Sequence, residues 1–112
     1  MTLNFMHDLA YFVGGLFLSN AVPHYVSGVM GRAFQSPFAR PPGKGLSSSA
    51  VNVVWGFVNL AIAYCAILRV GQFDPRAADQ IASLGAGLLL MGLCSAYSFG
   101  RFHGGNKPTA GA

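Results

Sequence analysis

Charged side chains are scarce in this sequence, and acidic ones are almost absent. Three Asp or Glu residues stand against seven Lys or Arg among 112 residues. Charged residues make up 9% of the chain and hydrophobic residues 53%, whereas soluble domains are about one quarter charged. This imbalance argues against an ordinary soluble domain. It places the chain in the membrane class, with one domain at most.

Cysteines are also few. Cys65 and Cys94 cannot build a disulfide framework, and we expect them near opposite ends of antiparallel helices, beyond the ~7 Å between Cα atoms that a disulfide allows. Metal ligands are scattered in the same way. His7 and His103 should lie on opposite sides of the membrane, and no Cys or carboxylate is placed to complete a site with His24. We therefore expect no metal and no cofactor.

A catalytic set is missing as well. No nucleophile, base and orienting acid can be assembled on one side of the membrane, and no acid lies within the long uncharged segments. The net charge of +4 is distributed over segment ends and loops, with no continuous basic face that would indicate nucleic-acid binding. We expect a protein that is not an enzyme, and the likelier counter-charges are anionic lipid headgroups.

What the sequence does contain is three long stretches without Asp, Glu, Lys or Arg, at residues 9–31, 45–68 and 80–100. Each reaches the ~20 residues that a helix needs to cross a ~30 Å hydrocarbon core. The sequence therefore predicts an all-α integral membrane bundle. Its three transmembrane helices are expected over about residues 5–30, 49–70 and 75–100.

The connections between these segments predict how they are arranged. Residues 32–48 are rich in Pro, Gly and basic residues and predict a loop. Asp74 followed by Pro75 favours the start of the third helix, because the carboxylate accepts from free amides while proline suits the first helical position. The short connection predicts an antiparallel hairpin of the second and third helices. Residues 101–112 are expected to form a disordered tail.

Charge asymmetry predicts the orientation in the membrane. One side holds five cations and no acid, whereas the other side holds two cations and all three acids. By the positive-inside rule, the amino terminus is expected outside, with the first loop and the carboxyl-terminal tail in the cytoplasm. The five cations are Arg32, Arg40, Lys44, Arg101 and Lys107.

Polar side chains interrupt two of the apolar segments and are the candidate ligand or path residues. Asn20 and His24 share one face of the first helix, and Asn52 and Asn59 share one face of the second. These two polar stripes are expected to face each other or an oligomeric neighbour. His24 either relays protons or binds a polar ligand, or it is a neutral histidine bonded between helices. Asn52 either helps to cap the second helix or contacts a substrate. Asn59 either forms a hydrogen bond between helices or lines a polar cavity.

The first loop contains candidates for binding anionic lipid, since each cation near a charged surface contributes about 1 kcal/mol. The alternative is a solvated loop whose charge only sets topology. The candidates are Arg32, Phe34, Phe38, Arg40 and Lys44.

Small residues repeat along one side of the third segment, at Gly85, Gly92, Ala96 and Gly100. Such a ladder lets helix backbones approach closely and is typical of packing faces in membranes. We therefore expect this small-residue ladder to be a helix-packing face.

Several short elements of the first two segments and their loop resemble a group of small, uncharacterised bacterial multi-pass membrane proteins. The resemblance implies a bacterial inner membrane and carries no activity or substrate. The elements are Asn20…Pro23-His24, Ser27-Gly28, Ser36-Pro37-Phe38, Pro42-Gly43 and Asn52-Val53-Val54-Trp55-Gly56.

The leading hypothesis is a structural or accessory subunit that packs into a homo-oligomer or a larger membrane complex. The alternative is a small homo-oligomeric transporter or channel, with a path lined by His24 and the asparagine stripes. The direction in which the asparagines point distinguishes the two. A wet cavity favours transport, whereas a dry contact between helices favours the accessory role.

Overall fold

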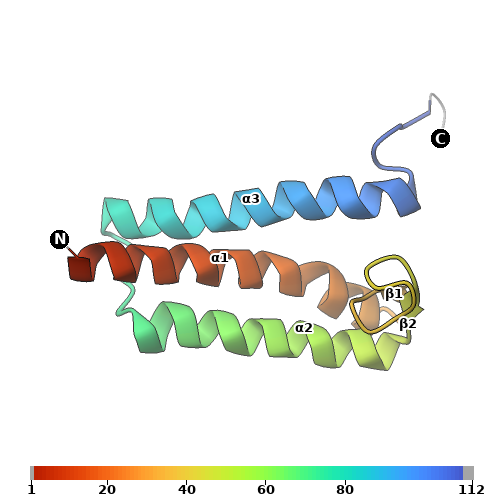
Figure 1. Ribbon diagram of the computed structural model, residues 1–112, viewed down its shortest axis with the longest axis horizontal. Helices are drawn as coiled ribbons and strands as arrows, with labels where there is room; N and C mark the ends of the chain where they lie inside the picture. Colours follow the sequence, from red (N-terminus) through yellow and green to blue (C-terminus); the bar gives the residue numbers. More distant parts are fainter. Residues whose placement is uncertain (1, 110–112) are drawn as a thin grey trace.

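The computed structural model describes residues 2–109, and most of them are helical (Figure 1). Helix α1 is Thr2–Val29 and helix α3 is Ala78–His103. Helix α2, Ser49–Tyr64, continues without a break into the π-helical segment η1, Cys65–Val70. The predominantly helical architecture agrees with the sequence prediction, but the first loop contains one feature that it missed.

That feature is a short β-ribbon between α1 and α2. Strands β1, Phe34–Gln35, and β2, Leu46–Ser47, pair in antiparallel fashion. Phe34 lies opposite Ser47 and Gln35 lies opposite Leu46. The ribbon folds over the end of the bundle at which α1 ends and α2 begins (Figure 1). It therefore gives a fixed shape to a segment that the sequence indicated only as a loop.

Helix α1 is the central element of the bundle. It packs along both α2 and α3, which lie on opposite sides of it (Figure 1). The second and third helices therefore form the predicted antiparallel pair without packing on each other along their length. They are consecutive and antiparallel, but residues 71–77 connect them around the end of α1, and α1 separates them along their length.

Glycines explain how α1 approaches both of its neighbours. A Cβ at Gly15 of α1 would collide with the carbonyl oxygen of Leu84 in α3, and a Cβ at Gly87 of α3 would collide with the carbonyl oxygen of Phe12 in α1. Gly56 of α2 lies against the backbone of α1 in the same way. Backbones this close leave no space for a side chain. The central position of α1 thus follows from glycines on two of its contacts.

Two helical segments of the described chain are long and apolar enough to cross a membrane, Ser49–Val70 and Ala78–His103. Most of their residues are not buried inside the chain, unlike those of a core helix in a soluble protein. Helix α1 is not a candidate span by the same criteria, so three spans are not shown. Polar residues such as Asn20 and His24 lower the mean hydropathy of α1. Because α1 is central, these residues are covered by α2.

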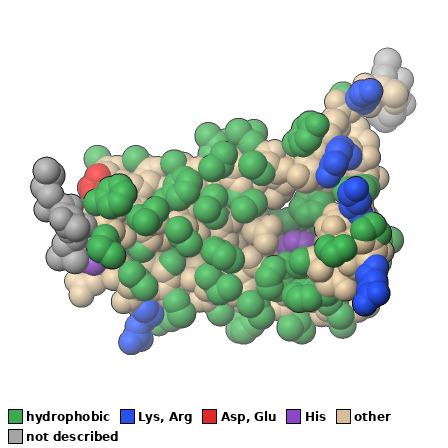
Figure 2. Space-filling view, viewed as in Figure 1, with side chains coloured by type: hydrophobic (Ala, Val, Ile, Leu, Met, Phe, Trp, Pro, Cys, Tyr) green, Lys and Arg blue, Asp and Glu red, His purple; other side chains and the backbone are tan. Residues whose placement is uncertain are grey.

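The surface of the bundle differs between its length and its ribbon end. Apolar side chains cover the length of the bundle in Figure 2, while Lys and Arg side chains gather at the ribbon end. Large apolar residues of all three helices are strongly exposed, including Phe57, Leu89 and Leu93 at 61% or more. Extended exposed apolar surface of this kind is typical of faces that contact lipid or another protein.

Helix α3 begins later than expected. The amide of Arg76 donates to Oδ1 of Asp74 at 2.9 Å, and the amide of Ala77 donates to the carbonyl oxygen of Asp74 at 3.0 Å. Asp74 therefore caps a separate turn that contains Pro75, and the helix starts only at Ala78. The predicted start near residue 75 corresponds to this turn.

The carboxyl-terminal segment is more ordered than predicted. Helix α3 continues to His103, and Gly104 ends it with a left-handed φ of 84°. The side chain of Asn106 then donates from Nδ2 to the carbonyl oxygen of Tyr97 at 2.8 Å and lies against Gly100. The first part of the expected disordered tail is thus folded onto α3. Residues 110–112 of that tail lie outside the described residues.

Candidate functional site

Asn52 connects the three elements that meet at the ribbon end. Its Oδ1 lies 2.8 Å from Nδ1 of His24 in α1. Its Nδ2 lies within donating distance of three carbonyl oxygens, those of Phe34 in β1 (3.2 Å), Ser47 in β2 (3.2 Å) and Ser48 before α2 (3.1 Å). The side chain is 0% exposed. One buried amide therefore holds both strands and both helices at this end.

These contacts determine which nitrogen of His24 carries the hydrogen. Because Nδ2 of Asn52 faces carbonyl oxygens only, the atom that faces His24 is the acceptor Oδ1. Nδ1 of His24 must therefore be the donor. In the neutral imidazole, Nε2 is then an acceptor. His24 is only 3% exposed, and the described residues offer no hydrogen-bond partner to this Nε2.

A second pair of amides lies deeper in the α1–α2 contact. Asn20 donates from Nδ2 to Oδ1 of Asn59 at 3.0 Å, and Asn59 donates from Nδ2 to the carbonyl oxygen of Trp55 at 2.8 Å. Asn59 is 0% exposed. The two polar stripes therefore face each other, one of the two arrangements expected from the sequence, and the asparagines of α2 lie in a dry contact.

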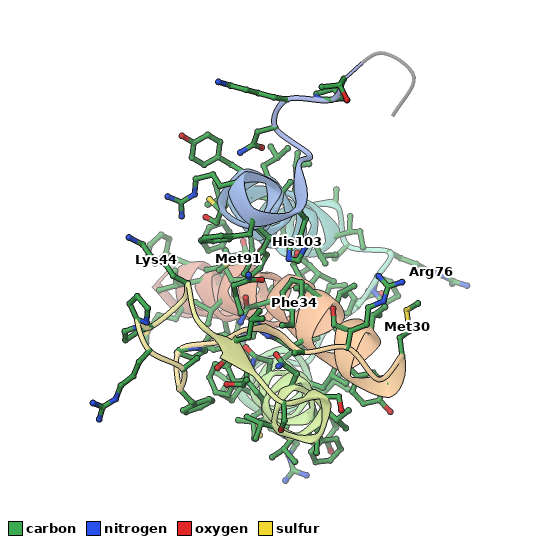
Figure 3. The ribbon with its side chains drawn as sticks, turned by 90° about the vertical axis from the view of Figure 1, so that its right-hand side faces the viewer. Met30, Phe34, Lys44, Arg76, Met91 and His103 are labelled. Carbon is green, nitrogen blue, oxygen red and sulfur yellow. The ribbon has the colours of Figure 1, made fainter. Side chains whose placement is uncertain are left out.

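Phe34 does not occupy the lipid-facing position assigned to it from the sequence. It is buried and stacks on His103, with ring centroids 5.2 Å apart and ring planes 3° apart, and its centroid lies 4.7 Å from that of Phe99. Figure 3 shows Phe34 and His103 together near the centre of the bundle end. Both residues of β1 are buried, and the contacts with Phe99 and His103 of α3 cover this ring, which the loop composition could not indicate.

A contact between Gln35 and His103 at the ribbon end was not predicted from the sequence. Oε1 of Gln35 lies 2.9 Å from Nε2 of His103. Gln35 stood in a stretch that predicted only a loop, and His103 stood in the expected tail, so no spacing signal joined them. Together with the Phe34 stack, this bond fastens the ribbon to the last turn of α3.

The Gln35–His103 bond gives a first prediction. His103→Phe should keep the ring stack on Phe34 but lose the bond, which is worth about 1 kcal/mol. The ribbon should then open roughly fivefold more often. Hydrogen exchange of the Ser36 amide, which donates to the carbonyl oxygen of Gly45 at 3.4 Å, reports this opening. His7→Phe, at the opposite end of α1, should leave the exchange rate unchanged. An unchanged rate in His103→Phe would show that the bond contributes nothing.

The other loop candidates lie on the outside. Phe38 is 61% exposed and contacts Trp55 edge to face, with centroids 5.0 Å apart. The cations Arg32, Arg40 and Lys44 are exposed, and Figure 3 shows Lys44 at the rim of the bundle end. These side chains take no part in the Asn52 contacts. They are free to meet the surroundings of the protein.

The predicted packing residues of α3 do not make its closest contact with α1. A Cβ at Gly85 would meet nothing within 4 Å, and one at Gly92 would lie 3.5 Å from the nearest atom of α1. Gly92, Ala96 and Gly100 instead line an apolar groove of about 480 Å³ between α1 and α3. The close contact is at Gly87, a position off the ladder, so the periodicity of small residues did not identify it.

The chain was compared with protein-family models, with curated proteins and with solved structures. None of them matches. Within the described residues, no group of three or more His, Cys, Asp or Glu is placed to hold a metal ion.

Proposed function

We propose that this chain is a three-helix integral membrane protein that acts as a structural or accessory subunit, packed into a homo-oligomer or a larger membrane complex. The observation that carries the proposal is the burial of Asn52 and Asn59 with their amides paired. Paired amides hold helices in a fixed arrangement and have little left to offer a passing solute. This pairing favours the accessory role over a transporter or channel.

In this proposal α1 crosses the membrane together with the two candidate spans. Its support is the position of α1, which runs between α2 and α3 over their length (Figure 1). A helix covered on two sides needs less apolar surface of its own than one surrounded by lipid. We place the bundle in a bacterial cytoplasmic membrane, with the amino terminus outside and the ribbon inside, because the ribbon end carries the cationic excess.

The ribbon end would then lie at anionic headgroups of the inner leaflet. The exposed cations Arg32, Arg40 and Lys44 and the exposed ring of Phe38 support this contact, since cations near such a surface attract it and an aromatic ring suits the interface. Phe34 has no part in this contact because it is buried. Lipid is thus a proposed partner of the ribbon surface alone.

The small-residue ladder of α3 is the proposed assembly face. Gly85 has open space beside it, and Gly92 and Ala96 line the apolar groove. Small residues with open space beside them leave room for the backbone of another helix, whereas Gly100, at the end of the ladder, is covered by Asn106. The exposed leucines Leu89 and Leu93 flank this face.

Gly92→Leu tests the assembly face. The larger side chain should fill the groove and weaken association roughly tenfold or more, while the chain itself stays folded because a Cβ at Gly92 meets only ordinary contacts. The measurement is the size of the complex after gentle extraction. Cys94→Leu is the matched control, because Cys94 is exposed two residues along on the other flank of α3. Normal assembly of Gly92→Leu would remove this face from the proposal.

A further inference from the structure

A small pocket of about 180 Å³ lies beside the Asn52 contacts. All three helices and the ribbon contribute to its wall, so it exists only in the assembled bundle. Its polar lining residues include Asn20, His24, Gln35 and Ser36, and its aromatic ones are Trp55 and Phe99. At about 30 Å³ per molecule in liquid water, this space corresponds to roughly six waters, or to one small organic molecule.

His24 gives this pocket a specific chemistry. Its Nδ1–H is used by Asn52, so the imidazole orientation is set before any ligand arrives. Its Nε2 is an acceptor without a partner among the described residues, and His24 as a whole is only 3% exposed. The indole Nε1–H of Trp55, in the same wall, is a buried donor that also has no partner among the described residues. A buried polar group of this kind is costly unless something bonds to it, so the pocket offers a ligand one free acceptor and one free donor.

We propose that this pocket binds a small uncharged molecule through a hydroxyl group that donates to Nε2 of His24. The apolar body of the ligand packs against the rings of Trp55 and Phe99. This site is separate from the assembly face of α3, and it does not depend on the proposed accessory role.

The wall of the pocket determines the ligand class. None of its lining residues is Asp, Glu, Lys or Arg, so a charged ligand would lose its hydration without gaining a counter-charge. A ligand with acceptors only would face the lone pair of Nε2 without a hydrogen between them. A hydroxyl group supplies that hydrogen, and its oxygen can also accept from the unpartnered Nε1–H of Trp55 in the wall.

The lining also explains why the ligand should carry a ring or a similar apolar body. The rings of Phe99 and His24 meet edge to face, with centroids 5.9 Å apart, and the ring centroids of Trp55 and His24 are 6.4 Å apart. These flat surfaces offer contact area to an apolar group at little cost in conformational freedom. Water alone would leave them poorly covered.

The test uses the full chain in lipid nanodiscs, with its histidines labelled with ¹⁵N, at pH 8, where imidazole is neutral. Phenol is the probe, and toluene, which has a methyl group in place of the hydroxyl, is the matched control. The readout is the ¹⁵N chemical shift of the His24 Nε2 signal during titration. His7→Gln and His103→Gln identify the other two histidine signals, so the assignment does not require a substitution at His24.

We expect phenol to shift the His24 Nε2 signal saturably, whereas toluene leaves it in place. In competition with phenol, toluene should bind roughly three- to tenfold more weakly, the loss expected for one hydrogen bond. A shift that rises without saturation, or one that toluene produces equally, indicates partition into the bilayer only and overturns the proposal. So does a saturable response confined to His7 or His103. His24→Phe should weaken phenol binding by the same factor, and the wild-type titration decides the matter if that variant does not fold.

Discussion

Asn52→Leu should destabilise the folded chain by about 3 kcal/mol or more. Leucine has the same number and branching of side-chain heavy atoms as asparagine, so the substitution leaves no cavity and removes the hydrogen bonds. The substitution leaves the buried Nδ1–H of His24 without its acceptor. It also removes the side-chain donor from the carbonyl oxygens of Phe34 and Ser47, at about 1 kcal/mol for each lost hydrogen bond. Each buried polar group left unpaired costs about 1–3 kcal/mol. The measurement is the free energy of unfolding in detergent micelles, followed by helical circular dichroism.

Val54→Ala is the control for this experiment, because Val54 lies two residues further along α2 and is 62% exposed. It should change the free energy of unfolding by less than about 1 kcal/mol. If Asn52→Leu lost no more stability than Val54→Ala, Asn52 would not hold the ribbon to the helices. The interpretation of the polar stripes as structural would then lack its main support.

Gly87→Leu should disrupt the contact between α1 and α3. Even a Cβ at this position would collide with the carbonyl oxygen of Phe12 and lie 3.0 Å from the amide nitrogen of Leu16. Because both obstacles belong to the backbone, the helices must separate. We expect a loss of at least about 3 kcal/mol, at the upper end of the range for overpacking. The same unfolding measurement applies.

Gly85→Leu is a closely matched control, since it adds the same side chain two residues earlier on α3. A Cβ at Gly85 meets nothing within 4 Å, so stability should be nearly unchanged and gain slightly from the better helix propensity of leucine. Equal losses in the two variants would mean that the cost comes from leucine in α3 itself. The packing of α3 on α1 would then not depend on Gly87.

The number and approximate extent of the helices followed from the sequence because uncharged stretches of this length have few alternatives in a membrane. The order of the helices in space did not. A short connection usually joins neighbours, yet residues 71–77 suffice to pass around the end of α1. The decisive contacts are single glycines such as Gly15 and Gly87. Isolated glycines give no periodic signal, whereas the ladder that includes Gly92 does and lies on a more open flank.

The candidate site was predicted in part. Helical spacing placed Asn20 with His24, and Asn52 with Asn59, because three- and four-residue steps share a face. The hydrogen bonds between Asn52 and the ribbon could not be predicted from helical spacing. Asn52 bonds to carbonyl oxygens of Phe34 and Ser47, and a carbonyl group is present in every residue. Only the register of the two strands brings these two oxygens to the amide.

If this chain works as a subunit of a membrane assembly, as we propose, the particle that contains the wild-type chain must have a mass well above that of one chain. The particle would be taken from the native membrane into nanodiscs without detergent, weighed, and its proteins identified. The account predicts a particle with further copies of the 11.7 kDa chain or with other subunits, dependent on the small-residue ladder of α3. A particle with a single 11.7 kDa chain and lipid alone would contradict it.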